Sequence, residues 1–350
     1  MLSSSIEITG RTIGLGHAPY VVAELSGNHM GEIERAFRLI DAAAVAGAHA
    51  VKLQTYTPDT MTIDVDGGDF LIPGGLWHGR TLYDLYREAH TPWEWHAPLF
   101  AHARKSGLTP FSTPFDETAI ALLESLDAPA YKIASFELVD IPLIRAVAGT
   151  GKPCLMSTGM ANMAEISDAV DAFHSAGGGE LILLHCVSGY PTPPEQANLH
   201  RIPELARRFG CLIGLSDHTL GTEVAIASVA LGVCLIEKHF TLRRADGGVD
   251  SAFSLEPAEF AQLASGARTA FGALGSGKDE IADAERPSLI FRRSIYVVRD
   301  IAEGEAFTSE NLKIIRPGYG LAPKEFEKLV GRRAARNVAR GTRMSWDLVS

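Results

Sequence analysis

Hydrophobic and polar positions follow one another along most of the chain in the order that a repeated strand–helix unit produces. Short continuous apolar runs alternate with longer stretches whose apolar residues recur at helical spacing. The apolar runs predict strands at Tyr20–Leu25, Ala50–Thr55, Thr109–Thr113, Ala130–Ser135, Pro153–Thr158, Leu181–Ser188, Leu212–Asp217 and Cys234–His239. The amphipathic stretches predict helices at Glu34–Ala46, Pro92–Lys105, Glu117–Leu126, Ala164–Ser175, Leu199–Arg208 and Pro257–Leu274. This alternation is typical of a parallel sheet covered on both faces.

The number of strands favours a closed barrel over an open sheet. Eight strand–helix units in about 250 residues are what a (β/α)8 TIM barrel requires. A doubly wound open sheet is the alternative, but it concentrates its site at one switch point. Here polar residues follow nearly every predicted strand, and no G-x-G-x-x-G follows the first one. The fold class that we predict is therefore α/β, with a (β/α)8 barrel.

Three segments do not follow the strand–helix rhythm. Residues Ile6–Leu15 alternate around Thr9-Gly10 and predict a short hairpin before the barrel. The glycine-rich segment Pro58–Glu88 predicts a long loop followed by aromatic residues, among them Trp77, Tyr83 and Tyr86. Such a loop on the site face of a barrel is a lid or a substrate wall. The alternative is a surface excursion that its aromatic residues only pin down.

The chain changes character over Gly272–Arg286, which is small, charged and flexible in composition, and we place a domain boundary there. The tail has short strand-like runs at Ser294–Val298 and Thr308–Ile315. We predict a barrel domain with its hairpin over residues 1–280 and a small, mainly β domain over residues 287–350. A module of that size has a thin core and gains from docking elsewhere.

Composition narrows the class of protein. Apolar residues make up 46% and charged residues 21%, which is ordinary for a soluble enzyme. The net charge of −10 argues against nucleic-acid binding, so an anionic substrate needs locally placed cations. No apolar run approaches the ~20 residues of a membrane span, and the start lacks a signal-peptide core. The four cysteines lack metal spacing and suit reduced thiols. We expect a cytoplasmic enzyme.

Two histidines follow matching ends of the last two predicted strands. His218 follows Leu212–Asp217, and His239 ends the strand after the next helix. A crossover helix makes these strands parallel, so the two imidazoles lie together if the strands are neighbours. Without cysteine partners they suit a divalent metal such as Mn, Mg, Co or Zn that activates a carbonyl. Glu24 would complete the shell or act as an acid/base. Asp217 and Glu237 flank the histidines, but the predicted chemistry uses neither.

Two lysines lie within predicted strands, where a barrel interior tolerates them only beside anions. Lys52 and Lys132, with hydroxyls on Ser135, Ser157 and Ser216, predict a site for a phosphate and a carboxylate together. The alternative is that the lysines form buried ion pairs with Glu24 and Glu237. Lys132 and Ser135 lie three residues apart, so both face one ligand only if a turn begins near Ser135. Lys238 alternates with His239 and is expected to point outward.

The motifs at the strand ends resemble those of the sialic acid synthase family. They are AELSGNHMG (23–31), AVKLQTYTPDT (50–60), FSTPFDET (111–118), YKIASFEL (131–138), STGM (157–160), HCVSGYPTPP (185–194), GLSDHTLG (214–221) and EKHFT (237–241). The tail runs RRSIYVVRDIAEGE (292–305) and IRPGYGL (315–321) resemble that family's C-terminal antifreeze-like (SAF, β-clip) domain. The resemblance covers essentially the whole chain, with the motifs in the same order.

The resemblance implies a reaction and roles for individual residues. Members condense phosphoenolpyruvate with an amino-sugar aldehyde to give a nonulosonic acid and phosphate, and they form homodimers with swapped SAF domains. Metal ligation by His218 and His239 is implied, with Mn or Mg as the metal and Co as a further candidate. Glu24 would handle protons, and the two histidines would act in catalysis through the metal. The implied phosphoenolpyruvate contacts are Lys52, Lys132, Ser135, Ser157 and Ser216, and the implied sugar contacts are Gln54, Glu137, Tyr190, Asp250 and, from the partner subunit, Arg316.

Within the family, LYDLYREAHTPWEWH (82–96) and GGVDSAFSLEP (247–257) most resemble the pseudaminic acid synthase branch. That branch uses 2,4-diacetamido-2,4,6-trideoxy-L-altrose, a sugar with few hydroxyls. N-acetylneuraminate and legionaminate synthases are the alternatives within the family. Outside it, a pyruvate-using metal aldolase would not need the lysines and serines, and a 3-deoxy-sugar-phosphate synthase would need further cations. A non-enzymatic alternative is a carbohydrate-binding SAF module on an inactive barrel.

Overall fold

The computed structural model describes residues 4–350 and divides the chain into two compact units, Met1–Gly275 and Ser276–Ser350. The first three residues of the predicted barrel domain lie outside the described residues. Each unit has its own hydrophobic core, and the two are described separately below. Within residues 4–350, no helix is long and apolar enough to cross a membrane.

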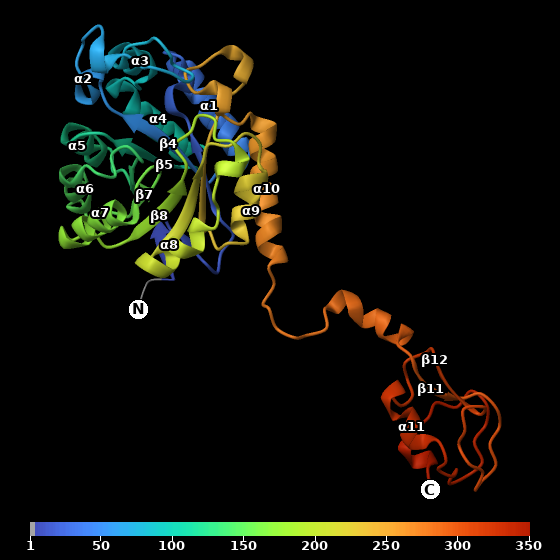
Figure 1. Cartoon of the computed structure of the whole chain (residues 1–350). Coiled ribbons are helices and arrows are strands. Elements are labelled where there is room, and N and C mark those ends of the chain that lie inside the picture. Colours follow the sequence, from blue (N-terminus) through green and yellow to red (C-terminus); the bar gives the residue numbers. More distant parts are fainter. Residues whose placement is uncertain (1–3) are drawn as a thin grey trace. The chain divides into compact units, whose positions relative to one another are not determined.

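The first unit is a closed barrel of eight parallel strands in chain order, with the last strand paired to the first (Figure 1). The strands are β3 (Tyr20–Glu24), β4 (Ala50–Thr55), β5 (Thr109–Pro114), β6 (Tyr131–Ile133), β7 (Cys154–Ser157), β8 (Leu181–Cys186), β9 (Leu212–Asp217) and β10 (Leu235–His239). All of their residues are buried except Gln54, which is half-buried. The closed parallel barrel confirms the predicted fold class.

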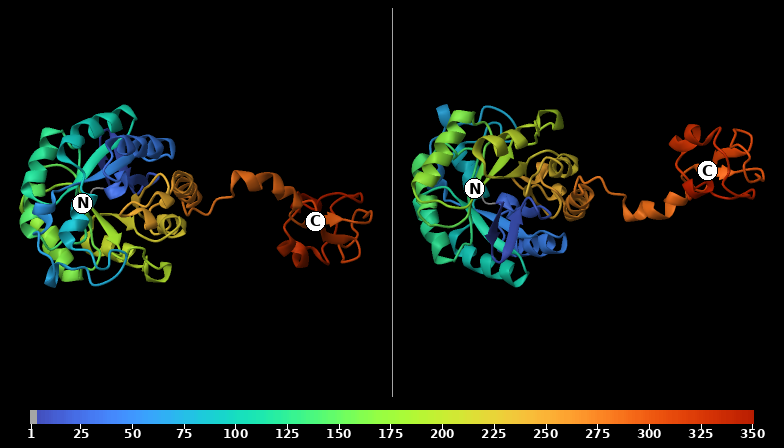
Figure 2. Two further views of the ribbon diagram at one scale, coloured as in Figure 1. Left: turned by 90° about the horizontal axis from the view of Figure 1, so that it is seen from above. Right: turned by 90° about the horizontal axis from the view of Figure 1, so that it is seen from below.

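Helices cover the outside of the barrel, as the views in Figure 2 show. They are α1 (Ile33–Val45), α4 (Trp93–Lys105), α5 (Glu117–Ser125), α6 (Ile141–Ala148), α7 (Met163–Ser175), α8 (Arg201–Phe209), α9 (Glu223–Val229) and α10 (Pro257–Ala273). Two shorter helices, α2 (Pro58–Met61) and α3 (Leu82–Ala89), belong to the long segment after β4 and lie at one end of the barrel (Figure 1). Helix α7 shows how local sequence features form such a helix. Asn162 caps its first amides, Glu165 bonds back to the Asn162 amide, and Phe173 lies on its buried face.

An N-terminal hairpin closes the end of the barrel at which the strands begin. It consists of β1 (Ser5–Ile8) and β2 (Arg11–Gly14), paired antiparallel. Its side chains Ile6, Ile8 and Ile13 join one apolar cluster with the first residues of the barrel strands, such as Tyr20 and Ala50. Because this end is filled with hydrocarbon, polar side chains in the barrel interior gather at the opposite end, where the strands finish.

The second unit is a small module with few regular elements. A 3₁₀ segment (Asp283–Phe291) precedes an antiparallel pair, β11 (Ser294–Val297) and β12 (Leu312–Ile315), and a short helix α11 (Phe326–Leu329) follows. Ten buried residues form its core, among them Phe307 and Met344. Such a small core agrees with the expectation of a thinly stabilised module.

Candidate functional site

The strand register brings predicted residues of the first two and the last strands into one row at the C-terminal end of the barrel. His239 of β10 pairs with Glu24 of β3, and Glu24 in turn pairs with Lys52 of β4. Next to this row, Ser216 of β9 pairs with Glu237 of β10. Five charged or polar side chains from distant parts of the sequence therefore meet in the barrel interior.

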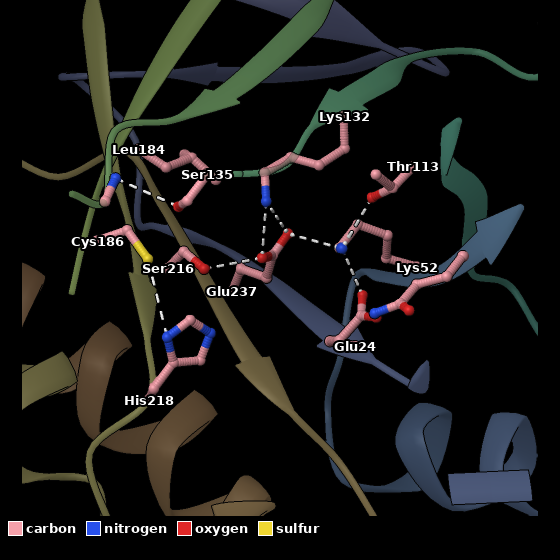
Figure 3. A network of polar contacts seen from close by, with 12 residues as sticks. Glu24, Lys52, Thr113, Lys132, Ser135, Leu184, Cys186, Ser216, His218 and Glu237 are labelled. Atoms are coloured by element: carbon pink, nitrogen blue, oxygen red, sulfur yellow. Dashed lines mark hydrogen bonds and ion pairs between the residues drawn. The ribbon is translucent and has the colours of Figure 1, made fainter. Parts of the chain in front are cut away.

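Two buried lysines and two buried glutamates form the centre of the site (Figure 3). The ammonium of Lys52 lies 2.6 Å from Glu24 Oε2 and 3.7 Å from Glu237 Oε2, and it donates to Thr113 Oγ1 at 3.1 Å. Lys132 donates to both carboxylate oxygens of Glu237, at 3.0 and 3.3 Å. The lysines thus form the ion pairs with Glu24 and Glu237 that the sequence left open as an alternative.

Burial and neighbouring charge act against each other on these groups. Burial by itself raises the pKa of the Glu237 carboxyl, but Lys132 and Lys52 outweigh that effect and lower it to about 2. Burial raises the pKa of Glu24, and Lys52 only partly reverses the rise. Burial lowers the pKa of Lys132 despite the nearby Glu237. Of the two carboxyl groups in the cluster, Glu237 therefore favours the ionised form more strongly. Glu24 is the one that binds a proton more readily.

The predicted serines surround this cluster from three strands. Ser216 donates to Glu237 Oε1 at 2.9 Å. Ser157 ends β7, and its buried hydroxyl has no hydrogen-bond partner within the described residues. Strand β6 stops at Ile133, so Ser135 lies in the following loop and accepts a hydrogen bond from the Gly159 amide at 3.2 Å. The early strand end removes the conflict between Lys132 and Ser135 that the alternation of an ideal strand would create.

The two histidines lie side by side, with ring centroids 5.4 Å apart. The Nδ1–H group of His218 donates to the Val187 carbonyl at 2.9 Å, which leaves its Nε2 lone pair free. Nδ1 of His239 is buried and has no hydrogen-bond partner among residues 4–350. Burial, assisted by the charge of neighbouring groups such as His218, lowers the pKa of His239 well below its usual value. His239 is therefore neutral, which is the form that binds a metal.

Aromatic side chains enclose the histidine pair. The Tyr190 ring lies 4.4 Å from the His218 ring, and Phe253 lies 4.8 Å from His239, centroid to centroid. From the long loop after β4, Trp77 reaches Tyr190 at 5.8 Å and donates its indole N–H to the Val249 carbonyl at 3.1 Å. The loop is therefore tied to the site through Trp77, as a substrate wall would be.

The remaining predicted residues differ in how close they come to this centre. Gln54 donates to Glu24 Oε1 at 2.9 Å. Glu137 lies after β6, and burial raises the pKa of its carboxyl to about 7. Asp250 is half-buried next to Val249, and burial raises its pKa as well. Arg316 belongs to the second unit, where it is exposed after β12, and its role towards a partner's sugar stays a prediction.

Sequence reasoning gave too little weight to three charged residues. The sequence offers Glu237 only as an alternative partner of the lysines, yet it contacts both of them, and its spacing of two from His239 places it on the same interior face. Lys238 does point out of the barrel, but it is fully buried there and paired with Asp217 at 2.6 Å. The register of β9 and β10 pairs Lys238 with Asp217, whereas the closed barrel brings Glu237 to lysines of the non-adjacent strands β4 and β6.

Comparison with known proteins identifies relatives over nearly the full length. A NeuB family model matches residues 39–279, and a SAF domain model matches residues 292–350. A pseudaminic acid synthase of Campylobacter jejuni subsp. jejuni is 43% identical over 322 residues, which cover 92% of this chain and 94% of that protein. One of Helicobacter pylori is 42% identical and covers 94% of this chain and 97% of that protein.

A solved structure supports the same relationship. The N-acetylneuraminic acid (sialic acid) synthetase of Leptospira borgpetersenii serovar Hardjo-bovis, in complex with citrate, matches with a TM-score of 0.74 at 32% identity. The match covers 82% of this chain and 96% of that one. Together these matches confirm the family that the strand-end motifs predicted.

The central position of Glu237 can be tested by its effect on stability. Glu237→Gln is expected to lower the free energy of unfolding by about 3 kcal/mol, because it leaves the buried Lys132 charge without its carboxylate. Glu124→Gln, which removes the partner of Lys152 from a half-exposed ion pair, should cost less than about 1 kcal/mol. Urea denaturation of the three chains measures both values. Equal losses of unfolding free energy in Glu237→Gln and Glu124→Gln would contradict the central position of Glu237.

The raised pKa of Glu137 predicts a pH dependence of stability. The carboxyl titrates near 4.5 in the unfolded chain and at about 7 in the folded chain, so the folded chain binds more protons between these values. Stability from this group is therefore lost as the pH rises from about 4.5 to 7. Glu137→Gln should remove that decline, and Glu124→Gln should not. Parallel stability curves for wild type and Glu137→Gln would refute the assignment.

Proposed function

The chain belongs to the NeuB family, and we propose that it condenses phosphoenolpyruvate with 2,4-diacetamido-2,4,6-trideoxy-L-altrose and water to give pseudaminic acid and phosphate. The identity of 42–43% to pseudaminic acid synthases supports this choice of sugar over those of other family members. Because phosphoenolpyruvate is a metabolite of the cytoplasm, we place the reaction there.

The observation that carries the proposal is the pair of buried lysines beside the histidine pair. Lys52 and Lys132 converge on one carboxylate, Glu237, whose oxygens lie 3.0–3.7 Å from the two ammonium groups. The phosphate and the carboxylate of a phosphorylated carboxylic acid can accept hydrogen bonds from the same two ammonium groups in place of the Glu237 carboxylate. The buried, unpartnered hydroxyl of Ser157 is a further donor for it. A pyruvate-using aldolase would have no need of two such cations.

The histidine pair fits a divalent metal. His218 has a free Nε2, and the buried His239 ring is neutral and lacks a partner for Nδ1 among the described residues. Residues 4–350 hold no group of three or more histidine, cysteine, aspartate or glutamate side chains placed for a metal, so substrate and water would fill the other positions. When bound, a divalent ion such as Mn or Mg supplies Lewis acidity towards a carbonyl oxygen.

The residues of the chain account for the remaining steps. Lys52 and Lys132 hold phosphoenolpyruvate so that its methylene carbon bonds to the aldehyde carbon of the open-chain sugar. Glu24, whose pKa is raised by burial, would deliver a proton to the aldehyde oxygen, which becomes a hydroxyl. Water then adds to the carbon that bears the phosphate and returns a proton. Cleavage of the C–O bond releases phosphate, which takes up the hydroxyl proton as hydrogen phosphate, and leaves a ketone, while the lysines offset the departing charge.

The aromatic enclosure supports a sugar with few hydroxyl groups. Tyr190, Phe253 and Trp77 present ring faces and edges around the histidine pair, with neighbouring centroids 4.4–5.8 Å apart. A deoxy methyl group and acetamido methyl groups bury favourably against such rings. The sugar contacts that we propose are these rings together with Gln54, Glu137, Asp250 and, from a partner subunit, Arg316.

A second copy of the chain is the partner that we propose. Four large apolar side chains are more than half exposed on loops that follow the barrel strands: Phe136 56%, Val139 61%, Met160 64% and Leu220 54%. An apolar rim around a site suits an interface. We propose that it receives the SAF unit of a partner chain in a homodimer, which would bring the partner's Arg316 to the sugar.

The proposed reaction is tested by phosphate release from phosphoenolpyruvate in the presence of Mn²⁺ or Mg²⁺ with a panel of amino sugars. Turnover is expected with 2,4-diacetamido-2,4,6-trideoxy-L-altrose, and oxygen-18 placed in the bridging position should leave with phosphate. His218→Ala is the matched inactive control. Equal turnover of N-acetylmannosamine would overturn the choice of sugar, and retention of the label in the keto acid would overturn C–O cleavage.

Trp77 is expected to act on the sugar and not on phosphoenolpyruvate. Trp77→Ala should lower kcat/KM for the sugar about tenfold or more, because it removes a large apolar contact, and should leave the KM for phosphoenolpyruvate within about twofold. Tyr83→Ala is the control from the same loop, since its hydroxyl contacts only Asp59 at the surface among the described residues. A matching rise in the KM for phosphoenolpyruvate would contradict this placement.

A further inference from the structure

A buried ion pair lies directly behind the histidine pair, on the outer face of the barrel. The Lys238 ammonium lies 2.6 Å from Asp217 Oδ2 and donates to the Thr219 carbonyl at 2.5 Å. The Lys238 side chain is 0% exposed and that of Asp217 is 3% exposed. A lysine buried this deeply is costly unless it is paired. None of the steps proposed above uses either residue.

The ion pair occupies one of two consecutive cross-strand positions between β9 and β10. Ser216 pairs with Glu237, and Asp217 pairs with Lys238. Side chains on a strand alternate between its two faces, so the first pair points into the barrel and the second points out. The rings of His218 and His239, which follow one position later, lie 5.4 Å apart. The ion pair thus joins the two strands immediately before both histidines.

Asp217 also fixes the turn that carries His218. One of its carboxylate oxygens accepts from the Thr219 amide at 2.9 Å, and the other accepts from the Thr219 hydroxyl at 3.1 Å. These bonds span His218 and form the side-chain turn that aspartate commonly makes with a residue two positions on. Lys238 anchors the same turn through the Thr219 carbonyl. The backbone of His218 is therefore held from the far side of β9.

We propose that Asp217 and Lys238 are positioning residues, whose ion pair fixes the separation of His218 and His239 and thereby sets the affinity of the site for a divalent cation. The inference rests on the proposed role of the two histidines as metal ligands. It goes beyond that role because Asp217 and Lys238 face away from the barrel interior and touch no substrate. Mutation of a residue that orients a metal ligand typically lowers metal affinity roughly 10- to 100-fold.

A purely structural pair would behave differently. Replacing a buried ion pair by neutral groups of similar size is often harmless to stability, whereas removing one partner is costly. If the pair only neutralises charge, the double variant Asp217→Asn/Lys238→Met recovers both stability and metal affinity. If the pair sets the geometry of the histidines, that variant recovers stability but not affinity.

The experiment titrates the metal-free full chain with Mn²⁺ by calorimetry and measures its unfolding temperature. Asp217→Asn and Lys238→Met should each lower Mn²⁺ affinity roughly 10- to 100-fold and lower the unfolding temperature. The double variant should regain the unfolding temperature and keep the weak affinity. Lys152→Met, which breaks an ion pair with Glu124 that none of these contacts involves, should bind Mn²⁺ like the wild type.

Thr219→Val keeps the proposal testable if the charge variants do not fold. It removes the hydroxyl bond to Asp217 without leaving a charge unpaired, so it should fold and bind Mn²⁺ more weakly. Wild-type affinity in Thr219→Val and in every folded charge variant, or recovery of affinity together with stability in the double variant, overturns the proposal. His218→Ala tests the metal role itself: wild-type affinity in that chain overturns the proposed function, whereas lost affinity leaves the test of the ion pair intact.

Discussion

The parallel register of β9 and β10 is the constraint on which the rest of the site depends. It pairs Ser216 with Glu237 inside the barrel and Asp217 with Lys238 outside it, and the two histidines follow. Each of these contacts is made between β9 and β10, so none exists until the two strands pair. A slip of one residue would turn Glu237 out and bring Lys238 in, which would exchange the sign of charge at the centre.

Pairing of opposite charges explains how lysine and glutamate side chains can be buried inside the barrel. Lys52 lies against Glu24 and Lys132 against Glu237, so each buried ammonium group has a carboxyl partner. In the proposed reaction, phosphoenolpyruvate would displace Glu237 from the two lysines. The ion pairs with Glu24 and Glu237 are therefore compatible with the substrate site that we propose for the same residues.

The sequence predicts the barrel well because its signals are local. Apolar runs, helical spacing and turn residues locate every strand to within a few positions, and the family motifs identify the residues around the His218–His239 pair. The contacts that a side chain makes with residues distant in the sequence leave no such local signal. The indole of Trp77 bonds a carbonyl 172 positions away, and Lys132 reaches a carboxylate 105 positions away. The early end of β6 at Ile133, which leaves Ser135 in the following loop, likewise has no mark in the local apolar pattern.

We propose that one site holds a metal on His218 and His239 and phosphoenolpyruvate on Lys52 and Lys132. Anomalous diffraction from crystals grown with Mn²⁺ and phosphoenolpyruvate tests this arrangement. A manganese peak bonded to both imidazoles is expected, with the phosphate and carboxylate of phosphoenolpyruvate against the two ammonium groups that Glu237 contacts in the present structure. Manganese bound elsewhere, or phosphoenolpyruvate bound with both lysines still on Glu237, would contradict it.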